Sequence, residues 1–241
     1  MVYAIFSDIH GNLEALEVAI DALSERKIDS YMCIGDIVGY GANPKECIKK
    51  TKELSSVIIR GNHDAAASGA KSPDDFNNSA RVAVEWTQSE LSQKEITFLK
   101  NLELVYKNQY ITLVHGTLYE PESFYYMFDE ASARATFNLM ETQTCFVGHS
   151  HVPGIFIKKQ NKIKYFYKEK LKLNKNEKAI INVGSIGQPR DGDPRLCCCL
   201  YDVDKSVVEL KRLPYDVEKT QSKILKAGLP PSLAQRLGEG I

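Results

Sequence analysis

Short apolar runs alternate with amphipathic segments over the first 150 residues of the chain. Residues 2–6 form a continuous apolar run that predicts a buried strand, and residues 13–23 carry apolar side chains at helical spacing. The same pattern predicts further strands at 30–34, 57–59, 110–114 and 144–147, and helices that begin near residues 44, 77, 92 and 129. This alternation indicates an α/β fold.

Beyond residue 150 the pattern becomes rich in strands. Extended segments at 154–159, 162–167, 179–183, 196–201 and 207–213 favour antiparallel strands, so we expect mixed sheets. A polar helical segment begins near Asp216, and Gly228, Pro230 and Pro231 interrupt it before a short terminal turn. Since no internal repeat or linker is visible, we expect one domain over residues 1–241, with residues 214–241 as a C-terminal helical extension.

Length and charge narrow the classes of protein. The chain has 241 residues, with 31 basic and 31 acidic side chains, so its net charge of zero gives no general reason to bind nucleic acid or an acidic membrane. Its apolar runs are strand-length and no charged leader precedes the first strand, which predicts a cytoplasmic protein without a membrane partner. The 6 cysteines show no Cys-x-x-Cys spacing, so we interpret them as reduced core residues.

Residues of metal-binding type follow the predicted strands. Asp8 and His10 follow the first strand, and alternate positions of an extended chain face the same way, so they offer an oxygen and a nitrogen to one point. Later strands lead into Gly35-Asp36, Gly61-Asn62-His63-Asp64, His115-Gly116 and Gly148-His149-x-His151. Ligands of α/β proteins bind at the carboxyl ends of strands, where these residues lie.

All 5 histidines of the chain belong to this pattern. A hydrogen-bonded structural role is the simpler interpretation of any single histidine, but scattered structural histidines would also fall within helices or in the strand-rich tail. We therefore predict a metal site with the ligand set Asp8, His10, Asp36, Asn62, His115, His149 and His151. Oxygen and imidazole without thiolate suit Mn, Fe, Zn, Ni or Co, and so many ligands suit two divalent ions that share a carboxylate.

The motif series resembles the calcineurin-like metallophosphoesterases, in particular their compact bacterial and archaeal phosphodiesterase branch. The motifs keep the family's order from residue 8 to residue 151, and the later segment 182–190 and Gly228-Leu229-Pro230 are also similar to that branch. The resemblance implies a four-layer α/β/β/α sandwich of two mixed sheets. It also implies that Asp8, His10, Asp36 and His151 hold one metal and that Asp36, Asn62, His115 and His149 hold the other.

The same resemblance implies a catalytic role for His63, with Asp64 orienting it. Two divalent ions, two carboxylates and one bridging hydroxide leave about one positive charge, which attracts a phosphate to a neutral protein. A paired-metal centre lowers the pKa of its shared water and clamps the oxygens of an in-line displacement. The expected reaction is therefore hydrolysis of a phosphate ester by metal-bound hydroxide, with His63 protonating the departing oxygen.

Substrate contacts are predicted less directly. Arg60, Arg190 and Arg195 are candidate phosphate contacts, with a structural ion pair as an equal alternative for each. The aromatic run at 119–128 contains Tyr125 and Tyr126, which can stack on a base or pack on the core. The lysine-rich stretch 158–178 is interspersed with Glu and Asn, which favours a solvated hairpin face over a nucleic-acid site.

The first interpretation is a metal-dependent phosphodiesterase that acts on small nucleotide-type substrates. Two segments that follow the metal motifs, 65–76 and 117–128, are long enough to wall the site, whereas a protein phosphatase needs a shallow one. A protein phosphatase, a phosphomonoesterase and a protein-binding scaffold of the same fold remain as alternatives. The oligomeric state is not indicated by any pattern in the sequence.

Overall fold

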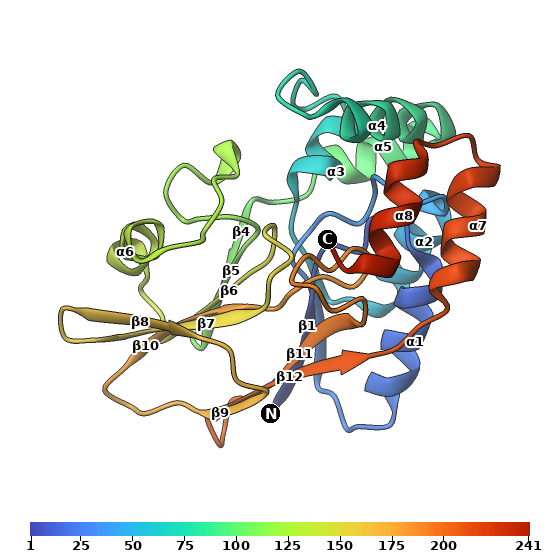
Figure 1. Cartoon of the computed structure of the whole chain (residues 1–241). Coiled ribbons are helices and arrows are strands. Elements are labelled where there is room, and N and C mark those ends of the chain that lie inside the picture. Colours follow the sequence, from blue (N-terminus) through green and yellow to red (C-terminus); the bar gives the residue numbers. More distant parts are fainter.

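The computed structural model describes residues 1–241 and contains two six-stranded sheets that face each other (Figure 1). The first sheet has the order β3 (Val57–Ile58), β2 (Ser30–Cys33), β1 (Val2–Phe6), β11 (Leu196–Asp202), β12 (Val207–Leu213) and β9 (Lys170–Lys172). The second has the order β4 (Val105–Lys107), β5 (Ile111–Val114), β6 (Thr144–Val147), β10 (Lys178–Asn182), β7 (Gly154–Lys159) and β8 (Lys162–Phe166).

Both sheets are mixed, as predicted. β1, β2 and β3 run parallel to one another, and β11 joins β1 in the antiparallel direction. β5, β6 and β10 also run parallel, whereas β7 is antiparallel to β10. The strands after residue 150 pair antiparallel with one another, as predicted. β10 also runs parallel to β6, because the chain makes the β7–β8 hairpin and adds β9 to the other sheet before β10 returns alongside β6.

The alternation of side chains on β1 shows how the layers form. Tyr3 and Ile5 point into a core between the sheets together with Phe146, whereas Ala4 and Phe6 point to the opposite face. The helices α1 (Leu13–Ser24) and α2 (Pro44–Leu54) cover that face, and α6 (Glu130–Leu139) covers the outer face of the second sheet. This is the expected four-layer α/β/β/α sandwich. All six cysteines are buried and free, in agreement with the prediction.

The C-terminal segment contains more helix than expected. α7 (Val217–Lys226) is followed by α8 (Pro231–Glu239), where a short turn was predicted. The first N–H groups of a helix have no hydrogen-bond partner within the helix, so a proline, which has no N–H, is tolerated at the first position. Pro231 therefore starts a helix. Leu233 and Leu237 of α8 are buried in a cluster with Tyr40, which lies on the loop after β2.

Other local differences are small. The structure adds α3 (Asn62–Ala67), which begins immediately after β3, and the short edge strands β4 and β9, whose few residues give no periodic signal. α4 (Asn78–Glu90) and α5 (Gln93–Lys100) lie where helices were predicted. Asn43 precedes α2, but its side chain does not cap the helix and instead accepts a hydrogen bond from Lys223 Nζ at 3.0 Å. None of the helices has the length and apolarity needed to cross a membrane.

Candidate metal centre and substrate pocket

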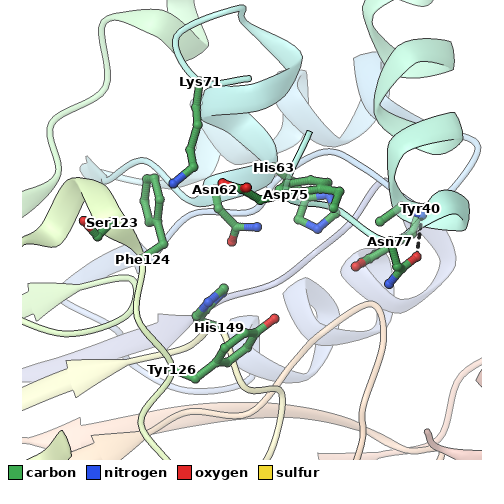
Figure 2. A pocket seen from close by; sticks show the side chains of 12 residues that line it. Tyr40, Asn62, His63, Lys71, Asp75, Asn77, Ser123, Phe124, Tyr126 and His149 are labelled. Carbon is green, nitrogen blue, oxygen red and sulfur yellow. Dashed lines mark hydrogen bonds between the residues drawn. The ribbon is translucent and has the colours of Figure 1, made fainter. Parts of the chain in front are cut away.

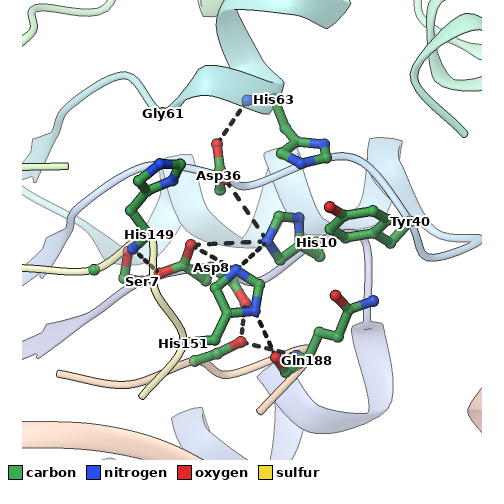
Figure 3. A network of polar contacts seen from close by, with 12 residues as sticks. Ser7, Asp8, His10, Asp36, Tyr40, Gly61, His63, His149, His151 and Gln188 are labelled. Atoms are coloured by element: carbon green, nitrogen blue, oxygen red, sulfur yellow. Dashed lines mark hydrogen bonds and ion pairs between the residues drawn. The ribbon is translucent and has the colours of Figure 1, made fainter. Parts of the chain in front are cut away.

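The seven predicted ligands lie at the carboxyl ends of parallel strands in both sheets. Asp8 and His10 follow β1, Asp36 follows β2, Asn62 begins α3 after β3, His115 follows β5, and His149 and His151 follow β6. Since the sheets face each other, these strand ends meet at one edge of the sandwich, where His115 lies next to Asn62 and Asp36. Figure 3 shows Asp8, His10, Asp36, His149 and His151 at this edge. All seven side chains are buried at this edge.

The backbone of most of these residues is strained. Five of them have positive φ angles, namely Asp8 (55°), His10 (49°), Asp36 (51°), His149 (65°) and His151 (60°). Non-glycine residues rarely adopt this left-handed region, and such strain concentrates where a site requires it. Hydrogen bonds between the first two loops hold it, with Asp8 N donating to Gly35 O at 3.0 Å and His10 N to Asp36 O at 2.9 Å.

Two glycines make room for the carboxylates, as their position beside the motifs suggests. A Cβ atom at Gly61 would overlap Oδ1 of Asp36, and a Cβ atom at Gly148 would overlap Oδ2 of Asp8. Next to Gly148, the backbone N–H of His149 donates a hydrogen bond to Asp8 Oδ2 at 3.0 Å, so this close approach also orients the carboxylate. Glycine at these two positions therefore allows one loop to pack directly on the ligands carried by another.

The ligand atoms form two overlapping groups. Asp8, His10, Asp36 and His151 form one and Asp36, His115 and His149 the other, and within each group the ligand atoms lie within 4.8 Å of one another. Asn62 joins the second group, because its Oδ1 lies 3.1 Å from His115 Nε2. Asp36 belongs to both groups, and its Oδ2 lies 3.3 Å from His115 Nε2 and 3.7 Å from His10 Nε2.

The hydrogen bonds around these rings fit a metal centre. His10 Nδ1 lies 3.2 Å from Val38 O and His151 Nδ1 lies 2.5 Å from Gln188 O, and because a carbonyl can only accept, both Nδ1 atoms carry the proton. In the neutral rings the two Nε2 lone pairs then face each other at 3.0 Å, which is unfavourable unless a cation lies between them. Asp8 Oδ1 and His149 Nε2 are also buried without a hydrogen-bond partner.

The charges of the cluster also favour cations. Burial opposes ionisation of Asp8 and Asp36, but neighbouring histidines outweigh it and lower the pKa of both carboxyls. Burial lowers the pKa of His149 and of His151 to about 3, so both rings are neutral ligands at neutral pH. For His115 burial is outweighed by Asp36 and Asp8, which raise its pKa to about 9, so a metal must displace a proton there.

His63 lies beside the cluster with its ring held by other rings. Its centroid is 4.4 Å from that of Tyr40 and 4.7 Å from that of Phe76, and its backbone N–H donates to Asp36 Oδ1 at 2.8 Å. Nδ1 of His63 is buried and has no partner. Burial lowers the pKa of His63 well below 6.5, although Asp36 opposes this shift.

Asp64 does not orient the His63 ring, contrary to expectation. Its Oδ1 accepts hydrogen bonds from the backbone N–H groups of Ile37 at 2.9 Å and Val38 at 3.3 Å, and its Oδ2 accepts from Gly61 N at 3.0 Å. Because α3 starts at Asn62, the side chain of Asp64 folds back over the helix N-terminus and toward the loop after β2. Asp64 thus fixes the backbone that carries Asp36 and His63.

A pocket of about 240 Å³ opens beside the cluster (Figure 2). Its lining includes His63, Asn62 and His149, so it reaches two of the predicted ligands and the predicted general acid. The two segments expected to wall the site both contribute, with Lys71, Asp75 and Phe76 from residues 65–76 and Ser123, Phe124 and Tyr126 from residues 117–128. The remaining lining residues are Tyr40, Asn77 and Ala80.

The two tyrosines predicted as substrate contacts differ in position. Tyr126 lines the pocket and stacks on His149, with ring centroids 3.9 Å apart and an angle of 13° between the planes. Its side chain remains half-exposed. Tyr125 is not part of the lining and instead donates a hydrogen bond to Glu120 at 3.3 Å. Only Tyr126 is placed where it can contact a substrate at the metal cluster.

Of the three predicted arginines, only Arg190 lies near the cluster. Its Nη2 donates to Gln188 Oε1 at 2.8 Å and to the Tyr40 hydroxyl at 3.3 Å. Arg195 is bound through two nitrogens to Asp193 at 3.0 and 2.6 Å, which is the alternative of a structural ion pair. Arg60 is turned away and donates to Lys100 O at 2.8 Å.

Three residues near the site were not predicted from the sequence as site residues. Tyr40 contacts both His10 and His63, at centroid distances of 4.6 and 4.4 Å. Phe124 packs edge-on against His115, and Lys71 lies over the Phe124 ring. The sequence signal for Tyr40 was its place in the glycine-rich turn that follows the Gly35-Asp36 motif.

Comparisons with known proteins agree with this geometry. A model of the calcineurin-like phosphoesterase superfamily domain matches residues 1–206. An uncharacterized protein of Methanocaldococcus jannaschii is 36% identical over 238 residues, with 97% of this chain and 96% of that protein covered. A metallophosphoesterase from Sphaerobacter thermophilus has a TM-score of 0.87 at 35% identity, covering 100% and 99% of the chains. A hypothetical protein from Pyrococcus horikoshii shares the fold, with a TM-score of 0.81, 19% identity and coverage of 100% and 98%.

Proposed function

The chain belongs to the calcineurin-like phosphoesterase superfamily and is a metal-dependent phosphoesterase, and we propose that it is a phosphodiesterase for small nucleotide-type substrates. The observation that carries the proposal is the pocket beside the metal cluster, in which a half-exposed Tyr126 stacks on His149. A flat aromatic face stacks on any base and stabilises binding by about 1–3 kcal/mol. A walled pocket of this kind suits a small ester better than a phosphorylated protein surface.

We assign the metal ligands by the two groups described above. Asp8, His10, Asp36 and His151 would hold one divalent ion, and Asp36, Asn62, His115 and His149 would hold the other, with Asp36 shared. When bound, the two ions supply Lewis-acid activation of water and of the phosphoryl oxygens. The hydrogen bonds from Nδ1 of His10, His115 and His151 to backbone carbonyls fix the ring tautomers and would leave each Nε2 lone pair available to an ion.

His63 is assigned as the general acid. It is the one histidine outside both ligand groups, and it lies in the pocket wall beside the cluster. Packing between Tyr40 and Phe76 fixes the plane of the ring, so its nitrogen atoms are positioned without a carboxylate partner. The low pKa caused by burial makes His63 a strong proton donor once an anionic substrate has drawn a proton to it.

Arg190 is assigned to the phosphate. It forms no salt bridge, its Nε is buried without a partner, and its backbone N–H donates to His151 O at 3.3 Å. A guanidinium held next to a metal ligand without a counter-ion suits an anion that arrives with the substrate.

A substrate screen tests the proposal. Metal-reconstituted protein would be assayed against phosphomonoesters, nucleotide diesters, dinucleoside polyphosphates and phosphopeptides. We expect the highest kcat/KM for substrates that contain a nucleoside and a diester or anhydride linkage. Faster cleavage of phosphopeptides or of simple monoesters would contradict the assignment while leaving the metal-dependent phosphoesterase activity intact.

A further inference from the structure

Lys71 extends into the pocket without a carboxylate partner. Its Nζ lies 5.4 Å from the centre of the Phe124 ring, and Figure 2 shows the nitrogen beside Phe124, on the side of Asn62 and Asp75. Lys71 forms no salt bridge, whereas Lys45 on the nearby surface pairs with Glu90 at 3.6 Å. Asp75 also lines the pocket but is exposed and lies more than 4.0 Å from the ammonium.

Both the backbone and the ring beneath Lys71 are fixed. Lys71 N donates to Ala65 O at 3.2 Å, which ties the residue to the end of the helix that begins with Asn62 and His63. Phe124 is buried and packs at 6.0 Å against His115. The ammonium therefore lies over a ring that packs against His115, a predicted metal ligand.

Lys71 and Arg190 lie at different places around the site. Arg190 is bound to Gln188 and Tyr40 beside His151, while Lys71 lies on the Phe124 side, near Asn62. A partly buried cation without a counter-ion lowers stability until an anion binds to it. The phosphate at the metal cluster can pair with Arg190. The unpaired Lys71 therefore indicates a second anionic group on the substrate.

We propose that Lys71 binds a second phosphate group, adjacent to the one that is cleaved, and that nucleotides with a polyphosphate chain are the preferred substrates. The inference rests on the proposed function and specifies its substrate class. In the reaction water forms a bond to one phosphorus and the bond from that phosphorus to the bridging oxygen breaks. One hydrogen of the water stays on the oxygen that is now bound to phosphorus. The other is released as a proton, and the departing phosphate takes up one proton. Lys71 interacts with that departing group and is a specificity residue.

The test compares two nucleoside substrates that differ in the second phosphate. Diadenosine tetraphosphate has additional phosphates beyond the cleaved bond, and thymidine 5′-(4-nitrophenyl phosphate) has none. For Lys71→Ala we expect a loss of about tenfold in kcat/KM on the tetraphosphate, the size typical for one hydrogen bond to a charged group, and a loss of about twofold on the nitrophenyl ester. Lys71→Arg should restore the tetraphosphate activity to within about threefold, because it keeps the charge.

Lys52→Ala is the matched control, since Lys52 Nζ also lies over a ring, at 4.5 Å from Phe98, but outside the pocket. It should change neither substrate. Equal losses for Lys71→Ala on both substrates, or no loss on either, would overturn the inference. If the wild-type enzyme cleaves the nitrophenyl ester but the tetraphosphate shows no dependence on Lys71, the proposed function stands and the inference fails. If the reconstituted enzyme cleaves neither substrate, both fail.

Discussion

The floor of the site, which consists of the seven predicted ligand side chains, and its walls, which are segments 65–76 and 117–128, are built in different ways. The floor is buried, its residues lie on the loops that follow strands, apart from Asn62 at the start of α3, and five of them have strained backbones held by hydrogen bonds between loops. The walls are loops and short helical turns, and Tyr126 in them is half-exposed. Catalytic chemistry thus resides where the structure is most constrained.

The difference shows how one fold can serve several substrates. The strand ends are fixed by pairing within the two sheets, so the distances between ligands cannot change without disturbing the core. The exposed positions of the wall segments, such as Asp74, Tyr119 and Tyr125, can vary in sequence at little cost in stability. Variants of the floor should therefore reduce every activity, and variants of the walls should change only the choice of substrate.

The largest effect is expected for Asp36→Asn. Because Asp36 lies in both ligand groups, metal occupancy at both sites should fall, and the loss of several kcal/mol of metal stabilisation corresponds to about a thousandfold or more in rate. His10→Ala, in which only one group loses a ligand, is the comparison. Elemental analysis and kcat/KM measure the outcome. Fully active wild-type enzyme with one ion per chain would disprove the shared carboxylate.

The next effect is expected for His63→Ala. Its metals should be retained, and the rate on esters with poor leaving groups should fall by about a hundredfold to ten-thousandfold. A nitrophenolate leaves without protonation, so the loss on nitrophenyl esters should be smaller. Equal losses on both kinds of ester would indicate that His63 positions the substrate and does not donate a proton.

The pH dependence of His63 sharpens the same point. Since burial places the pKa of His63 well below 6.5, its charged fraction in the free enzyme grows about tenfold for each unit by which the pH falls from 8 to 6.5. The ratio of kcat/KM for wild type to that for His63→Ala, on a poor leaving group, should rise by the same factor as the pH falls. Taking the ratio removes titrations that belong to the metal centre. A ratio that is constant with pH would contradict the assignment of His63 as acid.

The smallest effect is expected in the walls. Tyr126→Ala should reduce kcat/KM about tenfold on nucleotide substrates, the loss of one stacking interaction, and much less on bis(4-nitrophenyl) phosphate, which has no base. Tyr125→Ala is the matched control, because Tyr125 is equally exposed but outside the pocket, and should have no effect on either. If both tyrosine variants reduce all activities alike, the aromatic segment supports the fold and does not contact a base.

Part of this outcome could be predicted from local sequence. Apolar periodicity correctly located most helices and strands, and Asp and His residues after strands indicated a metal centre before any geometry was known. These features are local, because a strand and the residue that follows it are separated by only a few positions. The role of Asp64 was not predictable in this way, since its partners Ile37 and Val38 belong to a distant loop.

The sequence by itself determined the ligand types, the order of the motifs and the two segments long enough to form walls. Only the tertiary structure decided which side chains of those segments face the pocket, so that Tyr126, Phe124 and Lys71 line it and Tyr125 does not. It also showed that Arg190 lies next to the metal cluster whereas Arg195 is paired with Asp193, a difference that their positions in the sequence do not reveal. The physical reason is that side chains alternate between the two faces of a strand, so their direction can be read from the sequence. In a loop the direction of a side chain depends on packing with distant parts of the chain, which no local pattern encodes.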